Sequence, residues 1–241
     1  MNRKAFPIIW VIVLLVIVGA GIYFFSSLPG RQTIDKEKLG NSDCQSNPSP
    51  VFSVDITDLS KIIHIVPPVT VQKTGVKTHS YIFTGARVPV YAPADSVFYE
   101  GAFYEEEGMG QYSLFFRASC EVVYMLDHIK EPIGSIKANF STTPAGDSRT
   151  KRVESPISFK AGDLIGYTTG TSNGVWDFGA YNTAKQNPYS GLDLAHKEDL
   201  RFAHAVCPFD YFPQDKRQLY SNLLRNADGS TLTNPQSLCF Q

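Results

Sequence analysis

Three side chains of the kinds that bind metal ions occur in short apolar segments of this chain: His79, His128 and Asp177. Two imidazoles and one carboxylate can hold a zinc ion, and a catalytic zinc keeps a further position open for water or substrate. The same three residues also suit structural roles at strand ends and turns. The residue types therefore leave two interpretations: a zinc site, or three side chains that stabilise the fold.

Other kinds of chemistry are not indicated. The stretch 170–174 contains glycine at both ends, but it lacks the lysine and the following helix of a phosphate-binding loop. Ser113, Ser119 and Ser172 do not lie in the sequence pattern of a nucleophile elbow. The net charge is −1, so no basic surface for nucleic acid is expected.

The elements that would position these residues are predicted to be strands. From about residue 76 to residue 182, short segments with β-type composition recur about every ten residues, separated by glycine and proline turn signals. This spacing predicts an all-β sandwich or barrel. Alternate residues of a strand face opposite sides, so Trp176 and Phe178 either fill the core or line a groove.

Two segments carry a resemblance to a known family. They are Pro-Val-Tyr-Ala-Pro-Ala-Asp at 89–95, and Ala-Gly-Asp-Leu-Ile-Gly at 161–166 with Thr-Gly-Thr at 169–171. Residues 76–182 thereby resemble the lysostaphin-like zinc peptidases, which are murein hydrolases. The resemblance implies a duplicated-hybrid-motif barrel or sandwich, related to the biotinyl and lipoyl carrier barrels.

The zinc-binding motif of that family is incomplete here. The resemblance places Val175 and Asp177 at the two histidines of the family's His-x-His strand, with Trp176 between them. His79 lies near the family's first ligand, although no aspartate follows it before Asp95. His128 follows a tyrosine, as a family histidine does, but is displaced by two residues. The candidate residues of the groove or relic site are His79, His128, Val175, Trp176 and Asp177.

The resemblance therefore implies a degenerate peptidase with no catalytic residues and no cofactor. We expect such a domain to bind cell-wall polymer or to regulate a wall hydrolase. One alternative is an active zinc metalloendopeptidase of cell-wall peptide, with His79, His128 and Asp177 as altered ligands. Another alternative is a structural surface or assembly protein.

The N-terminus predicts attachment to a membrane. Residues 5–28 contain no charged residue, and this uncharged stretch is long enough for a single transmembrane helix. Arg3 and Lys4 precede this stretch, so the positive-inside rule places the C-terminal domain outside the cytoplasm. A cleaved signal peptide is the alternative.

Four cysteines in an exported chain predict two disulfides. Cys207 and Cys239 both lie beyond the β-rich region, so we expect them to pair with each other and leave Cys44 to pair with Cys120. Free buried thiols are the alternative, because sequence separation does not fix the geometry that a disulfide requires.

Four regions are expected along the chain. Residues 1–30 form the cytoplasmic N-terminus and anchor, 31–50 a linker, 51–195 the β domain, and 196–241 a short helical, disulfide-linked extension. In the last region, 214–224 predicts an amphipathic helix with Leu219, Tyr220, Leu223 and Leu224 on one stripe. The chain stops two residues after Cys239, so a truncated C-terminus is an alternative.

Overall fold

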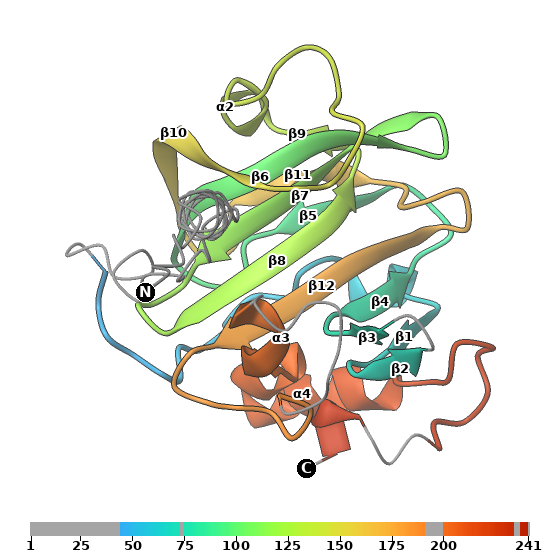
Figure 1. Cartoon of the computed structure of the whole chain (residues 1–241). Helices are drawn as coiled ribbons and strands as arrows, with labels where there is room; N and C mark the ends of the chain where they lie inside the picture. The colour runs from blue at the N-terminus through green and yellow to red at the C-terminus, as the bar shows by residue number, and fades with distance from the viewer. Residues whose placement is uncertain (1–43, 73–74, 191–199, 234–236, 241) are drawn as a thin grey trace, which may run out of the picture. The chain divides into compact units, whose positions relative to one another are not determined.

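Antiparallel strands are the main regular element of the computed structural model, which describes residues 44–72, 75–190, 200–233 and 237–240 (Figure 1). The largest sheet has the strand order β1-β4-β12-β8-β7-β6-β10, and β13 pairs with β12. Its strands are β1 (His64–Val66), β4 (Ser80–Phe83), β12 (Val175–Asn182), β8 (Val122–Ile129), β7 (Met109–Arg117), β6 (Ser96–Glu106), β10 (Lys151–Phe159) and β13 (Ala205–Val206). The predicted mainly β fold is confirmed.

Two smaller sheets accompany the large one. Strands β5 (Val88–Tyr91), β11 (Leu164–Thr168) and β9 (Glu131–Pro132) form one sheet, and β2 (Thr70–Gln72) pairs with β3 (Gly75–Lys77). The helical elements are short: η2 (Leu59–Lys61), α2 (Gly134–Lys137), α3 (Leu200–His204), η3 (Pro208–Tyr211), α4 (Gln214–Asn222) and η4 (Leu238–Phe240). Within the described ranges, no helix has the length and apolar character needed to cross a membrane, and the predicted anchor at residues 5–28 lies outside them.

The central strands of the large sheet are buried on both faces. In β12, every residue from Trp176 to Asn182 is buried. Tyr124 of β8 is fully buried, stacks on Phe116 with ring centroids 4.9 Å apart, and its hydroxyl lies 2.8 Å from the Ser96 hydroxyl. A strand covered on both sides holds its side chains in fixed positions, which is the condition for a precise site.

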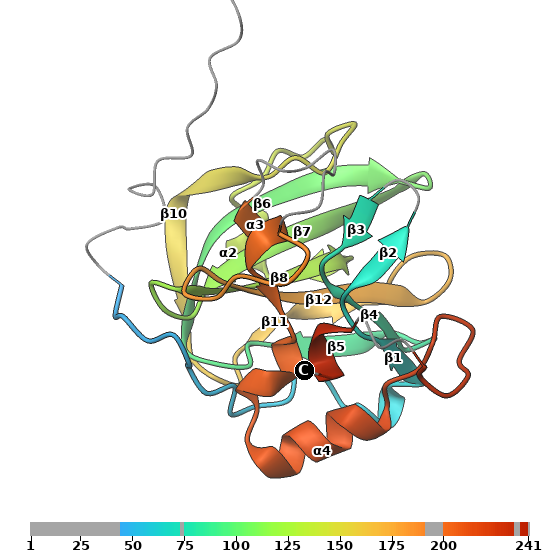
Figure 2. The same cartoon turned by 60° about the horizontal axis from the view of Figure 1, so that its bottom comes forward.

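The C-terminal segments pack into the same core as the sheet. Phe209 and Tyr220 belong to the hydrophobic cluster that contains Phe178 of β12, and their rings stack with centroids 4.9 Å apart. Helix α4 lies near β1 (Figure 2), where the Ile65 amide donates to the Leu223 carbonyl. The helix predicted over 214–224 is confirmed over Gln214–Asn222, but Leu219 is exposed rather than on a buried stripe.

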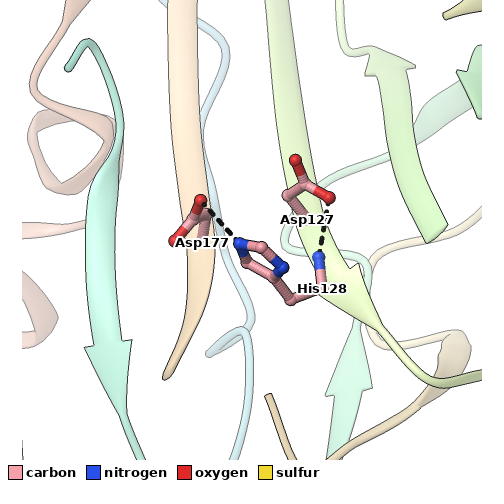
Figure 3. A group of neighbouring side chains, drawn as sticks. All are labelled: Asp127, His128 and Asp177. Carbon is pink, nitrogen blue, oxygen red and sulfur yellow. Dashed lines mark hydrogen bonds and ion pairs between the residues drawn. The ribbon is translucent and has the colours of Figure 1, made fainter. Parts of the chain in front are cut away.

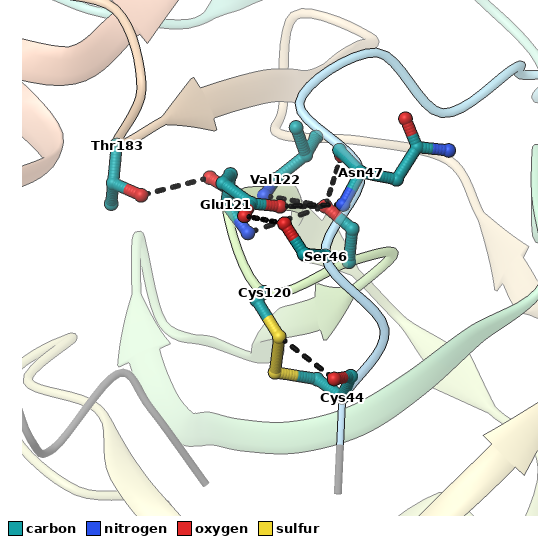
Figure 4. Close-up of a disulfide and its surroundings, with 8 residues drawn as sticks. Cys44, Ser46, Asn47, Cys120, Glu121, Val122 and Thr183 are labelled. Carbon is teal, nitrogen blue, oxygen red and sulfur yellow. Dashed lines mark hydrogen bonds between the residues drawn. A yellow bond between two sulfur atoms is a disulfide. The ribbon is translucent and has the colours of Figure 1, made fainter. Parts of the chain in front are cut away.

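Both predicted disulfides are present, Cys207 with Cys239 and Cys44 with Cys120. The second bond fixes the segment after Cys44 against the loop between β7 and β8 (Figure 4). Glu121 in that loop accepts hydrogen bonds from the Ser46 hydroxyl at 2.5 Å and the Asn47 amide at 2.7 Å. The described end of the predicted linker is therefore held against the β domain.

Candidate functional site

Asp177 lies in the middle of the sheet, on the strand between β4 and β8. Its backbone partners are Tyr81 on β4 and Asp127 on β8. Alternation along β12 places the neighbouring Trp176 and Phe178 on the opposite face, where both are fully buried. The groove interpretation is therefore wrong for these two aromatic side chains, because they fill the core and reach no surface.

Two histidines contact the Asp177 carboxylate. Its Oδ2 atom lies 3.1 Å from His79 Nε2 and 3.4 Å from His128 Nε2. His79 is the residue directly before β4, and His128 is the second-last residue of β8; these two strands flank β12. His128 has a positive φ of 60°. The structure therefore brings together the three candidate ligands identified in the sequence.

Asp127 is a fourth member of the cluster. Its Oδ1 atom accepts hydrogen bonds from the His128 backbone amide at 2.7 Å and from the Tyr104 hydroxyl at 2.8 Å. Asp127, His128 and Asp177 each offer one ligand atom within 4.8 Å of the other two (Figure 3). Glu106 adds another carboxylate at the rim, with Oε2 3.5 Å from His128 Nδ1.

The electrostatics of the cluster stabilise the anionic form of Asp177 and the imidazolium form of His128. Burial would raise the pKa of Asp177, but the nearby His79 and His128 outweigh it and hold that pKa below its usual value. Burial lowers the pKa of His128, but the carboxylates of Asp177, Asp127 and Glu106 outweigh it, so that pKa is raised. Burial also raises the pKa of Asp127, helped by the charge of Asp177.

One oxygen of the cluster has no partner. Asp177 is 3 % exposed, and its Oδ1 atom is buried without a hydrogen bond from any residue that the structure describes. A buried carboxylate oxygen without a partner is costly, because it has lost its water and gained nothing in return. A cation beside Asp177 would remove this cost.

A cavity of about 210 Å³ reaches the cluster at His79 and Asp127. Hydroxyl side chains, Ser113 and Thr150 among them, line it together with the apolar side chain of Phe115. Arg201 also lines it, with its guanidinium carbon 4.9 Å from the centre of the Phe115 ring. A small polar group could enter this cavity and contact His79 and Asp127.

The remaining predicted site residue, Val175, lies at the start of β12, two residues before Asp177 and therefore on the same side of the strand. Its apolar side chain can neither bind a metal ion nor carry a proton. Of the other histidines, His64 stacks on Phe83 with ring centroids 4.0 Å apart, and its Nε2 atom is buried. His204 contacts the Lys185 carbonyl, and His196 lies outside the described residues.

Asp127, Tyr104 and Glu106 are not among the site residues predicted from the sequence. The adjacency of Asp127 to His128 was a usable signal, but its alignment with Asp177 depends on the register between β8 and β12. No protein-family model, curated protein or solved structure matches this chain.

Proposed function

We propose that this protein is a membrane-anchored extracytoplasmic protein whose β domain binds a divalent metal ion and recognises cell-wall peptide without cleaving it. Zinc is the first ion to test. The observation that carries the metal site is the grouping of Asp127, His128 and Asp177, with ligand atoms within 4.8 Å of one another. Nitrogen and carboxylate oxygen are the ligands that zinc takes in proteins, alongside thiolate.

The chain's own residues fit such an ion. Ligand atoms of one zinc ion lie roughly 3–4 Å apart, because each lies about 2 Å from the metal. The three candidate ligands need only a small adjustment to reach that separation. His79, which contacts Asp177 Oδ2 at 3.1 Å, would then either orient this carboxylate or replace Asp127 as the third ligand.

A metal ion would also account for the two facing carboxylates. Asp127 and Asp177 are cross-strand neighbours, and like charges in this position destabilise a sheet. Tyr104 and the His128 amide satisfy one oxygen of Asp127, but nothing in the described residues satisfies Asp177 Oδ1. A bound zinc ion would neutralise the negative charge of the two aspartates and could also polarise a carbonyl oxygen of a bound peptide.

The resemblance to lysostaphin-like peptidases supports the choice of cell-wall peptide as the ligand. The same resemblance argues against cleavage, because Val175 stands where the family has the first histidine of its His-x-His strand. The cavity beside His79 and Asp127, lined by hydroxyl groups and Arg201, supplies space for a peptide group. Binding or regulation of a wall hydrolase would use the same face of the domain.

An active zinc metalloendopeptidase is the second candidate function. The cavity that reaches the cluster favours it, because a catalytic zinc needs access for water and substrate. Glu106, whose Oε2 atom lies 3.5 Å from His128 Nδ1 at the rim of the cluster, would then be the carboxylate placed to take up a proton beside a bound peptide.

The extracytoplasmic location rests on two supports. Residues 5–28 carry no charge and follow Arg3 and Lys4. Both disulfides join described residues, and structural disulfides persist in oxidising compartments.

Cosedimentation of the full chain with purified insoluble peptidoglycan, in a non-ionic detergent, tests the function. We expect zinc-dependent pelleting that a chelator reverses, with no release of peptide fragments. Release of fragments that requires zinc and His128 would establish the endopeptidase instead. Absence of both pelleting and release would contradict wall recognition and favour a structural or assembly role.

A further inference from the structure

A second cavity, of about 560 Å³, lies away from the His–Asp cluster, at the edge of the large sheet. The start of β6, the end of β7 and the strand β10 line it, and Cys44 of the Cys44–Cys120 disulfide closes one side. This volume is within the usual range for pockets that hold small organic ligands, roughly 300–1,000 Å³.

A bulge in the edge strand borders this cavity. The pairing of β10 with β6 shifts register between Arg152 and Ile157, so the residues between them leave the ladder. On β6 the shift lies opposite Tyr99, whose side chain lines the cavity. Bulges are common beside functional sites because they redirect side chains and interrupt pairing.

Positive side chains dominate the wall of the cavity. Arg117, Arg152 and Lys160 line it, against the single carboxylate of Asp95. Lys160 Nζ already pairs with Asp95 Oδ2 at 2.8 Å. Arg117 and Arg152 form no ion pair with any carboxylate that the structure describes, and Arg117 Nε is buried without a hydrogen-bond partner.

Tyr99 holds the Arg117 side chain in place. The guanidinium carbon of Arg117 lies 4.8 Å from the centre of the Tyr99 ring, in a cation–π contact. When the flat face of a guanidinium lies against a ring, the N–H donors at the edge of the guanidinium stay available. These donors match the spacing of two oxygens of a carboxylate or phosphate. The contact therefore presets an anion-binding group at little cost in side-chain entropy.

Most of the remaining lining is apolar or carries hydroxyl groups, and Gln45 adds an amide. Val97, Phe159 and Pro156 supply apolar surface, and Ser96, Ser119 and Ser158 are the hydroxyl residues. Such a lining would accept a compact apolar group attached to an anion better than a free inorganic ion.

We propose that this cavity binds a small organic oxyanion, a carboxylate or phosphate attached to an apolar group, through the guanidinium groups of Arg117 and Arg152. The proposed oxyanion site shares no residue with the proposed metal site and does not depend on it. Loss of zinc binding would leave it intact, and failure of the oxyanion site would leave the zinc site intact.

Calorimetric titration of the full chain in a non-ionic detergent tests the proposal. The probes are benzoate and phenyl phosphate, with benzyl alcohol as the uncharged control. We expect at least one of the two anions to bind with one molecule per chain, and no binding of benzyl alcohol. Absence of binding by both anions, or equal binding of benzyl alcohol, would overturn the proposal.

Three arginine variants locate the binding. Arg117→Met should weaken binding roughly tenfold or more, because a hydrogen bond to a charged group is lost. Arg152→Gln should weaken it several-fold and, because Arg152 is exposed, should leave the fold intact even if Arg117→Met does not. Arg149→Gln is the matched control, since this exposed arginine pairs with Asp147 outside the cavity. Unchanged binding by Arg152→Gln, or an equal loss in Arg149→Gln, would place the anion elsewhere and overturn the proposal.

Discussion

Asp177 of β12 and Asp127 of β8 are directly opposite each other in an antiparallel pair, with His128 contacting both. Two facing carboxylates in the middle of a sheet repel each other unless positive charge lies between or beside them. His128, whose pKa is raised by the surrounding carboxylates, supplies part of that charge. Asp177 Oδ1 still has no partner among the described residues, which is why we infer a metal ion at this position.

The Asp127→Asn variant separates metal binding from stability. It removes one of the facing charges and keeps an oxygen to accept from Tyr104 and the His128 amide. We expect the free energy of unfolding without metal to stay equal or rise by about 0.5–1 kcal/mol, while zinc affinity falls at least roughly tenfold, as on loss of a ligand or its close partner. Urea denaturation and zinc titration measure the two effects.

The control for this variant is Glu154→Gln, an exposed carboxylate on β10 outside the cluster. It should change neither quantity. A loss of stability in Asp127→Asn with unchanged zinc affinity would mean that Asp127 has a structural role only.

Gly166→Ala should destabilise the smaller sheet. A Cβ atom at Gly166 would lie 2.5 Å from the Glu131 carbonyl oxygen and 2.7 Å from Pro132 Cα, both backbone atoms of β9. Overpacking of this kind costs about 1–3 kcal/mol of unfolding free energy. Gly134→Ala is the matched control, because no atom lies within 4 Å of its added Cβ. Equal stability of the two variants in urea would contradict the close packing of β11 on β9.

Loss of the Cys207–Cys239 disulfide should weaken the C-terminal packing. The bond closes a segment with a sequence separation of 32, and removing a cross-link of this kind costs about 2–4 kcal/mol through the entropy of the unfolded chain. The Cys207→Ser/Cys239→Ser double variant, compared with the parent protein in urea, measures the cost. An unchanged midpoint and slope would show that the C-terminal segment is held by its apolar contacts alone.

Stability should fall with acid partly through His64. Burial, and then the charge of Arg225, lower the pKa of this histidine below its ordinary value of about 6.5. The folded protein therefore favours neutral His64, and its contribution is complete above about pH 6.5. It is lost as the pH falls from there through the lowered folded-state pKa.

The His64→Gln variant isolates this effect from the other histidines. The difference in unfolding free energy between the parent protein and the variant should shrink or reverse between pH 7 and pH 5. A difference that stays constant with pH would mean that His64 does not titrate in this range.

Three residues of the site could be predicted from their types, but the full set of residues in the cluster depends on the register between neighbouring strands. His79, His128 and Asp177 have metal-binding side chains and were recognisable in the sequence. Asp127 required knowledge that β8 and β12 align these two aspartates, and no local pattern encodes that pairing. The pairing is set by the packing of the whole sheet.

The uncertain fold predictions had a similar cause. Trp176 could fill the core or line a groove, because a strand buried on both faces lacks the apolar–polar alternation that would identify its outer side. Leu219 fits the helical stripe of α4, yet it is 51 % exposed because Tyr220 and Leu224 are the residues that face the sheet. The disulfide pairing was predictable because two cysteines lie together beyond the β-rich region.

Zinc content is the most direct test of the central claim that the His–Asp cluster holds a metal ion. The full chain, purified in non-ionic detergent and dialysed first against a slight zinc excess and then against zinc-free buffer, is analysed beside Asp177→Asn and the control Glu154→Gln. We expect close to one zinc per chain in the parent protein and in Glu154→Gln, and almost none in Asp177→Asn. A parent protein without zinc, or an Asp177→Asn protein that retains it, would contradict the account.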